Sequence, residues 1–428
     1  MNPLINEKDK ERENSINFED TIGAVQNQSK IRPKFLYDIS GAHTATVNVV
    51  RFSPNGMFLA TGGDDSAIVI WVQKSRPVEF GSTLEKISWS NHKILRGHLS
   101  DIYDISWSPD SKYLISGSVD NSAIIWNVEK AKGIQKFNDH NHFVQGVSWD
   151  PKNKYIITQS SDKSARIYKN AEMKQEVKFY FQNQLKRYSS IENANSNSVN
   201  NNPLNKDNYA EDKMLVDKEV NIQKKNPINN YQHYFADETQ CPSFVRRHSW
   251  SPDGSICLLV AGVHKEEEGE LENVVWGLIR KDMTKPYFLL PTLDKSATCV
   301  RFCPMIFEKT TDENSETVEL IDLPYKMVFA VGTLDTLFIY DTQSIVPRYV
   351  ITNIHYQPIT DLAWKGASLL AASSSDGYIT FCHFDREELG KIAEIEKLPE
   401  KVGQTFKQYL SIDINKNILQ TQNRKIFN

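Results

Sequence analysis

The chain has 428 residues, 39% hydrophobic and 24% charged, so it can hold two or three ordinary domains or one large repeat structure. Its net charge of −4 supplies no basic field, which argues against direct sequence-specific nucleic-acid binding. The charged N-terminus argues against a secretory signal, and the longest apolar run, 256–263, is too short for a membrane span. The five cysteines are an odd number, which indicates reduced thiols.

The first 33 residues are charged and polar, and we predict a disordered tail at 1–33. The body of the protein follows at 34–391. A stretch at about 182–230 is dense in Asn and Lys and poor in aromatics, so it buries too little apolar surface to offset the entropy of ordering. We predict a disordered insertion there, and a C-terminal tail without a further repeat at 392–428.

Three segments of the body align without gaps, starting at His43, His98 and His140. In each, an aromatic residue follows the His by nine positions and opens an S/D-P-x-x turn. An Asp lies 22 positions after the His, a Ser or Thr four before that Asp, and a final aromatic six after it. The three sets are His43, Thr61, Asp65, Trp71; His98, Ser116, Asp120, Trp126; and His140, Thr158, Asp162, Tyr168.

These residue types suit the turns of a four-stranded β-sheet. The Asp can accept backbone N–H groups of its turn while it bonds the His of the incoming loop. The His can pass the connection to the Ser or Thr hydroxyl and on to the indole N–H. The pattern therefore predicts one structural tetrad in each of the three repeats.

Three more degenerate repeats start near Arg246, Thr298 and His355. Six repeats in one body predict an all-β fold, a WD-repeat β-propeller with six recognisable blades. Separate β-sandwich domains are the alternative, but they predict no fixed spacing from His to Asp.

Each repeat also offers the His, Ser/Thr and Asp of a hydrolase triad. A catalytic triad is a single constellation with an exposed nucleophile, whereas this set recurs at three turns. Cys299 and Cys303, with His264, could be considered as metal ligands, but alternating cysteines are more typical of small core residues. We predict a protein that is not an enzyme and has no cofactor and no metal.

Two clusters are candidate partner contacts. Arg246 and Arg247 beside Trp250 could form a basic and aromatic patch, or the arginines could pack across a blade edge. The second cluster is an acidic stretch, which could equally be a solvated hairpin tip; its members are Glu266, Glu267, Glu268 and Glu270.

Longer strings carry a family resemblance, among them VNVVRFSPNG, LRGHLSDIYDISWSPD, FVRRHSWSPDGS, LPYKMVFAVGTLDTLFIYDTQS and NIHYQPITDLAW. Over 35–390 they resemble the family of the middle, WD-repeat subunit of chromatin assembly factor 1, the chaperone that deposits histones behind replication forks. The related WD-repeat histone chaperone of the replication-independent pathway shares GGDD, SVDN and WSPDG. The strings YDTQ and NIHY resemble the assembly-factor subunit more closely.

The resemblance implies a nuclear scaffold that joins the large and small subunits of chromatin assembly factor and binds histones of the central nucleosome tetramer. The acidic stretch would then be a weak contact for basic histone surface. A substrate adaptor of a ubiquitin ligase remains an alternative for any propeller.

The chain departs from this family in two places. The family has seven blades, and no first blade is recognisable before Lys34. The family's Arg-Arg docking motif for the anti-silencing histone chaperone is missing or reduced to residues 423–426, which puts that partner in doubt. Because an unpaired strand edge is a liability, we predict that Lys34–Ile39 pairs with the strand at Tyr378–Phe384 and closes the ring.

Overall fold

A computed structural model describes residues 38–75, 87–171, 178–185, 233–265, 269–310, 319–385, 387–400 and 402–403. These residues form antiparallel strands, the short 3-10 helix η2 (Ile395–Lys397), and an α-helical turn of which 400 and 402–403 are described. The strands are β1 (Val47–Phe52), β2 (Phe58–Gly63), β3 (Ala67–Ser75), β4 (Ile87–Arg96), β5 (Ile102–Trp107), β6 (Tyr113–Ser118), β7 (Ala123–Asn127), β8 (Lys132–Phe137), β9 (Val144–Trp149), β10 (Tyr155–Ser160), β11 (Ser164–Asn170), β12 (Phe179–Leu185), β13 (Ser249–Trp250), β14 (Ile256–Lys265), β15 (Leu271–Ile279), β16 (Phe288–Pro291), β17 (Ala297–Glu308), β18 (Tyr325–Thr333), β19 (Thr336–Asp341), β20 (Tyr349–Thr352), β21 (Ile359–Lys365), β22 (Leu369–Ser374) and β23 (Ile379–His383).

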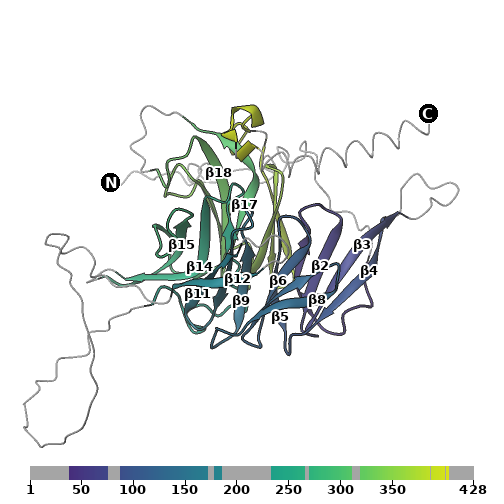
Figure 1. Ribbon diagram of the computed structural model, residues 1–428. Coiled ribbons are helices and arrows are strands. Elements are labelled where there is room, and N and C mark those ends of the chain that lie inside the picture. The colour runs from purple at the N-terminus through teal and green to yellow at the C-terminus, as the bar shows by residue number, and fades with distance from the viewer. Residues whose placement is uncertain are drawn as a thin grey trace, which may run out of the picture. The chain divides into compact units, whose positions relative to one another are not determined.

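The strands form six sheets in which each strand pairs with the next along the chain. Five sheets have four strands, and the sixth has three, β21–β23, within the described residues. The first strands of successive sheets contact one another, from β1 and β5 through β9, β13 and β17 to β21. In Figure 1 the sheets follow one another in chain order, from purple β2 and β3 to green β17 and β18. The predicted all-β propeller with six recognisable blades is confirmed, and the strands of the described residues do not form separate β-sandwiches.

The turn between the first two strands of a sheet explains the S/D-P-x-x motif. After β1, the Ser53 N–H donates to the Phe58 carbonyl at 2.9 Å, and the Ser53 hydroxyl donates to Asn55 Oδ1 at 2.7 Å. Gly56 takes a φ of +67°, a left-handed conformation that glycine adopts without strain. Side-chain oxygens thus satisfy the turn, and the second, third and fourth sheets have the same turn at Ser108, Asp150 and Ser251.

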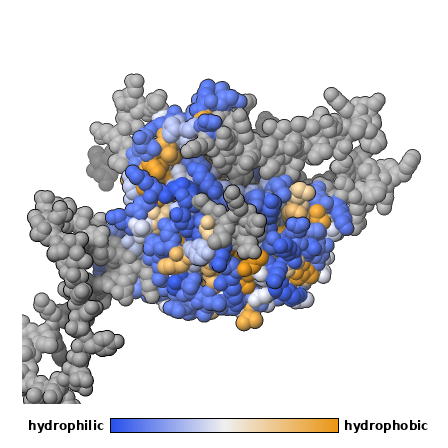
Figure 2. Space-filling model, in the orientation of Figure 1, coloured by the Kyte–Doolittle hydropathy of each residue, from blue (hydrophilic) through white to orange (hydrophobic). Residues whose placement is uncertain are grey.

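The core lies between neighbouring sheets. Ile68 and Ile70 of β3 belong to one buried cluster with Ile105 and Leu114 of the second sheet. The longest apolar run of the sequence is the buried part of β14, which lies inside the fourth sheet. On the face shown in Figure 2, hydrophobic residues form small separate patches among hydrophilic ones.

The described residues divide into two units. The small unit contains residues 38–39, 74–75 and 87–88, and in it the Ser88 hydroxyl donates to the Lys74 carbonyl at 3.2 Å. The large unit contains the remaining described residues and all the sites considered below.

Several predicted segments lie wholly or partly outside the described residues. The tail at 1–33 does, and so do Lys34 to Tyr37 of the predicted closing strand. The predicted insertion at about 182–230 starts within β12, which runs to Leu185, and 186–232 are not described. Of the predicted tail at 392–428, the described part contacts the fifth sheet: Ala393 N–H donates to the Ile306 carbonyl at 2.9 Å.

Candidate functional site

The residues of the first two predicted tetrads lie within hydrogen-bond distance of one another. His43 Nδ1 is 3.0 Å from Asp65, and its Nε2 is 2.7 Å from the Thr61 hydroxyl, which accepts the Trp71 indole N–H at 2.8 Å. The second set has the same three distances. Its members are His98, Ser116, Asp120 and Trp126.

The third set has a different last link. His140 is 3.0 Å from Asp162 and 2.7 Å from Thr158. The Tyr168 hydroxyl donates to Asp139 at 2.8 Å, so the residue before the His receives this hydrogen bond. The phenol hydroxyl lies at the far end of its ring, whereas an indole N–H lies close to the point where the ring is attached, so Tyr168 reaches a different partner from Trp71 and Trp126.

The tetrad carboxylates accept several hydrogen bonds at once. Asp65 accepts the backbone N–H groups of Thr44 at 3.1 Å and Ala67 at 3.2 Å as well as bonding His43. Burial alone would raise the pKa of Asp65, but the hydrogen bonds from His43 and the two backbone groups lower it below its ordinary value. Ser116, the hydroxyl of the second set, is fully buried. These sets therefore support structure and offer no accessible nucleophile.

The sixth sheet keeps only half of the tetrad. His355 Nδ1 is 3.0 Å from Asp376, but Ala372 stands four positions before that Asp, where the other sets have Ser or Thr. His355 Nε2 is buried without a hydrogen-bond partner.

The predicted basic and aromatic patch is not on the surface. Arg246 and Arg247 are 0% and 2% exposed, and Trp250 is 7% exposed. Arg246 donates to the Ala236 carbonyl at 2.7 Å. Of the acidic stretch, Glu270 is exposed between β14 and β15, and Glu266, Glu267 and Glu268 lie outside the described residues.

We call the first strand of each sheet its inner strand, because the first strands of neighbouring sheets contact one another. Five charged residues that are not part of the repeat motif lie in or beside these inner strands. Arg51 and Arg301 each stand one position before the aromatic residue of their turn, and Asp104, Arg247 and Asp361 each stand three positions before theirs. Because side chains alternate along a strand, both positions share one face, separated by about 7 Å. Each charged residue comes from a different sheet, so the five groups meet where the inner strands converge.

Asp361 is the centre of this charged network. Its carboxylate accepts hydrogen bonds from Arg51 and Arg247, and the Arg301 guanidinium lies 3.2 Å away. Asp104 pairs with Arg51 at 3.1 Å and accepts the Val147 N–H at 3.1 Å. The network therefore connects the inner strands of all six sheets.

The pKa shifts differ between the members of the network. Burial alone would lower the pKa of Arg51, but the charges of Asp361 and Asp104 raise it above its ordinary value. Burial alone would raise the pKa of Asp361, but the charges of Arg247 and Arg51 hold it far below the usual range. Burial and the neighbouring Arg51 charge lower the pKa of Arg301. Burial also lowers the pKa of His248 to about 4, so this side chain is neutral at pH 7.

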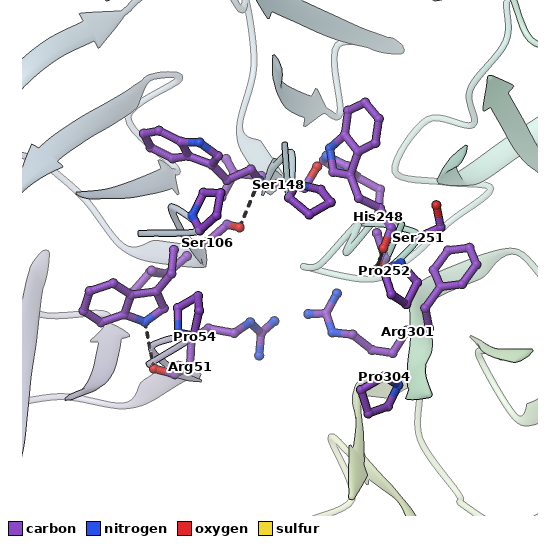
Figure 3. Close-up of a pocket in the computed structure, with 18 of the residues that line it drawn as sticks. Arg51, Pro54, Ser106, Ser148, His248, Ser251, Pro252, Arg301 and Pro304 are labelled. Atoms are coloured by element: carbon purple, nitrogen blue, oxygen red, sulfur yellow. Dashed lines mark hydrogen bonds between the residues drawn. The ribbon is translucent and has the colours of Figure 1, made fainter. Parts of the chain in front are cut away.

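A cavity of about 350 Å³ opens beside the network, and we call it the channel basin. It is lined by inner-strand residues, among them Arg51 and Arg301, and by the aromatic and proline residues of five turns. Figure 3 shows the guanidinium groups of Arg51 and Arg301 pointing toward each other across the space. The prolines stand two positions after the aromatics and are Pro54, Pro109, Pro151, Pro252 and Pro304.

Indole groups hold the backbone of both basin arginines in place. The Trp107 N–H donates to the Arg51 carbonyl at 3.0 Å, and the Trp364 N–H donates to the Arg301 carbonyl at 3.0 Å. In each case the indole belongs to the following sheet. The backbone at both arginines is thus held in place before any ligand arrives, which lowers the backbone entropy lost on binding.

The cysteines considered as metal ligands are core residues. Burial raises the pKa of the Cys299 and Cys303 thiols to about 12, so both are protonated. Among the described residues, no group of His, Cys, Asp and Glu has a geometry that could hold a metal ion. No helix in the same part of the chain is long and apolar enough to cross a membrane.

The charged network was missed from the sequence, although a signal was present. Five of the six repeats each contribute one Arg or Asp to the network, and a single charged residue in a short segment is not distinctive. Aligning all six repeats on their turn aromatics places Arg51 with Arg301 and Asp104 with Arg247 and Asp361. The alternation of side chains then predicts that both sets face the same side.

Comparisons with known proteins place this architecture in a family. A family model described as the CAF1B/HIR1 beta-propeller domain matches residues 22–204 and 204–389. The chain is 36% identical to the chromatin assembly factor 1 subunit FAS2 homolog of Oryza sativa subsp. japonica, over 86% of this chain and 66% of that protein.

Two further relatives are also named as subunits of chromatin assembly factor 1. The protein of Mus musculus is 38% identical over 81% of this chain and 57% of its own length. That of Schizosaccharomyces pombe is 36% identical over 88% of this chain and 82% of its own length. The chain therefore spans less than two thirds of the rice and mouse relatives.

Proposed function

Because the chain belongs to the CAF1B/HIR1 β-propeller family, we propose that it is a scaffold subunit of a nuclear histone chaperone complex, chromatin assembly factor 1, and not an enzyme. In this role the propeller joins the large and small subunits and helps deposit core-tetramer histones on newly replicated DNA. The match to relatives named for this complex, at 36–38% identity, carries the proposal.

The geometry of the repeats supports a binding role. The histidines and hydroxyls of the first three sheets are committed to hydrogen bonds within their own sheet, and Ser116 and Thr158 are fully buried. A propeller of this kind offers surfaces rather than a reacting group, and complementary surfaces are sufficient for a scaffold. The exposed Glu270, with the adjoining acidic stretch, is proposed as a weak contact for basic histone surface.

The replication-independent chaperone is a second candidate, because the matching family model includes HIR1. Names and identities of the relatives favour the assembly factor.

Affinity purification of the tagged full chain from its own cells, followed by mass spectrometry, tests the proposal. The expected result is co-purification of the large and small assembly-factor subunits with core-tetramer histones. Recovery of replication-independent chaperone subunits would favour the second candidate, and recovery of ubiquitin-ligase subunits would contradict both. An Asp65→Ala, Asp120→Ala double variant is the control for retention that depends on a folded propeller.

A further inference from the structure

The channel basin has a charge surplus that no described neighbour neutralises. Three arginines and two aspartates form the network, which leaves one positive charge in excess. The two arginines that line the basin, Arg51 and Arg301, have side chains 19% and 21% exposed, whereas Arg247 is 2% exposed. The excess cation is therefore accessible from the basin.

We propose that the channel basin binds a carboxylate-bearing side chain of a partner polypeptide, with Arg301 and Arg51 as the binding residues. A carboxylate between the two guanidinium groups would balance the network and accept charge-assisted hydrogen bonds from a planar donor. This inference rests on the basin alone and goes beyond the role proposed above, so either can fail without the other.

A bound anion would stabilise the charge of Arg301 more than that of Arg51. Its guanidinium has one carboxylate neighbour, Asp361 at 3.2 Å, and a hydrogen bond to the Val300 carbonyl at 3.1 Å. Arg51 pairs with both Asp361 and Asp104. The lowered pKa of Arg301, caused by burial and by the Arg51 charge, has the direction expected of a cation that lacks full compensation.

The rim of the basin favours a polypeptide over a small free anion. Five prolines and the side chains of Trp107, Trp149 and Trp250 line the basin together with the arginines. Apolar contact with such a rim stabilises the side chains on either side of a bound Asp or Glu, and a hydrated phosphate ion gains nothing from it. The volume of about 350 Å³ fits one or two side chains. A surplus of a single charge is also too small for nucleic acid, which binds through many phosphates.

Fluorescence anisotropy with labelled, capped peptides tests the proposal on the full chain. One peptide alternates glutamate and leucine, and its counterpart has glutamine in place of glutamate. We expect the glutamate peptide to bind at least about tenfold more tightly, the factor that corresponds to one charged hydrogen bond. Equal binding of the two peptides, or no binding, would overturn the proposal.

Arg301→Ser is the main variant, because Ser106, Ser148 and Ser249 occupy the same strand position in other sheets. It should weaken binding of the glutamate peptide by about tenfold or more. Arg96→Ser makes the same charge change at an exposed residue of β4 outside the basin and should leave binding unchanged. Equal losses in both variants would contradict a role of the basin.

A second variant keeps the proposal testable if Arg301→Ser unfolds. Ser249→Glu places a carboxylate inside the basin, where it supplies the anion from within the chain. It should abolish peptide binding and leave the melting temperature unchanged or higher, since it balances the surplus charge. Undiminished peptide binding in Ser249→Glu, or full displacement of the peptide by equimolar inorganic phosphate, would show that the peptide does not use the basin as proposed.

Discussion

Asp361 in the inner strand of the sixth sheet accepts a hydrogen bond from Arg51, which lies 310 residues earlier in the inner strand of the first. Asp361 also accepts from Arg247 of the fourth sheet. Contacts between residues so distant in sequence carry a large loop-closure entropy, which the packing of the intervening blades offsets. The pair therefore connects the two ends of the repeat series only when all blades are in place.

Replacing Asp361 with Asn should lower the free energy of unfolding by about 3 kcal/mol, because it leaves three arginines close together without their shared carboxylate. Urea denaturation measures this loss. Asp322→Asn is the control: this carboxylate is 94% exposed beside Lys309, and its removal should change stability by less than about 0.5 kcal/mol.

The effect of Asp361→Asn depends on pH in a defined direction. The pKa of Asp361 is lower in the folded than in the unfolded protein, so its contribution is fully present above the unfolded value near about 4. The contribution declines as the pH falls below that value. The stability difference between the wild type and the variant should thus be constant from neutral pH to about 5 and shrink in more acidic solution; a difference that grows toward low pH would contradict the network.

Replacing Asp120 with Ala should lower stability by about 1–3 kcal/mol, since it leaves the N–H of Leu99 and the N–H of Ser122 without their acceptor and separates His98 from its partner. The melting temperature measures the change, with Asp294→Ala, at an exposed loop position, as the control. An unchanged melting temperature would argue against the tetrad as a stabilising unit.

Replacing Ala372 with Ser should stabilise the protein by about 1 kcal/mol. The hydroxyl would stand where Thr61, Ser116 and Thr158 stand in the first three sheets, and could pair with His355 Nε2, which is now buried without a partner. Ala371→Ser, on the opposite face of β22, is the matched control and should give no such gain. A lower melting temperature for Ala372→Ser would show that the site has no room for the hydroxyl.

Replacing residues 187–228 with a short Gly-Ser linker should leave the fold and the melting temperature unchanged, because this stretch has too few apolar residues to contribute to a core. The deletion starts after Leu185, which pairs with Ala165 and is buried. Circular dichroism and thermal melting test it; insoluble protein would show that the stretch is needed for folding.

Strand β23 gives a test of the proposed ring closure. This strand pairs with β22, and two of its apolar residues are solvent-exposed: Ile379 is 60% exposed and Phe381 is 48% exposed. We propose that Lys34–Ile39 pairs with it, as the strand pattern of the sequence predicts. A cysteine at Phe35 should then form a crosslink with one at Phe381 in oxidising conditions. A crosslink formed only between chains would contradict this closure.

The fold could be predicted from the sequence because the residues that stabilise a turn and the residues that bond to them lie within the same repeat. The spacing from His43 to Asp65 is fixed by one hydrogen-bonded set within one sheet, so a single repeat contains the whole signal. The channel basin could not be predicted in this way. Its members, such as Arg51 and Asp361, come from different repeats and have meaning only when six strands are placed around one axis.

The environment of the two arginines near Trp250 could not be predicted from the sequence either. Arg246 and Arg247 are adjacent and charged, which is typical of a surface. Arg247 nevertheless occupies the position three before the turn aromatic, which faces the converging inner strands, and it is buried against Asp361. Position within the repeat decided its environment, and residue type alone did not.

The charged network also limits how alike the six repeats can become. Six copies of the first repeat would place six arginines one position before the turn aromatics, and six copies of the last would place six aspartates two residues deeper. Either array would bring like charges together at short range with no counter-charge, at a cost of several kcal/mol. A protein built from six copies of either repeat would therefore lose the opposite-charge pairs that the arginines of the network make with Asp104 and Asp361. These pairs need different residues at equivalent positions of different repeats.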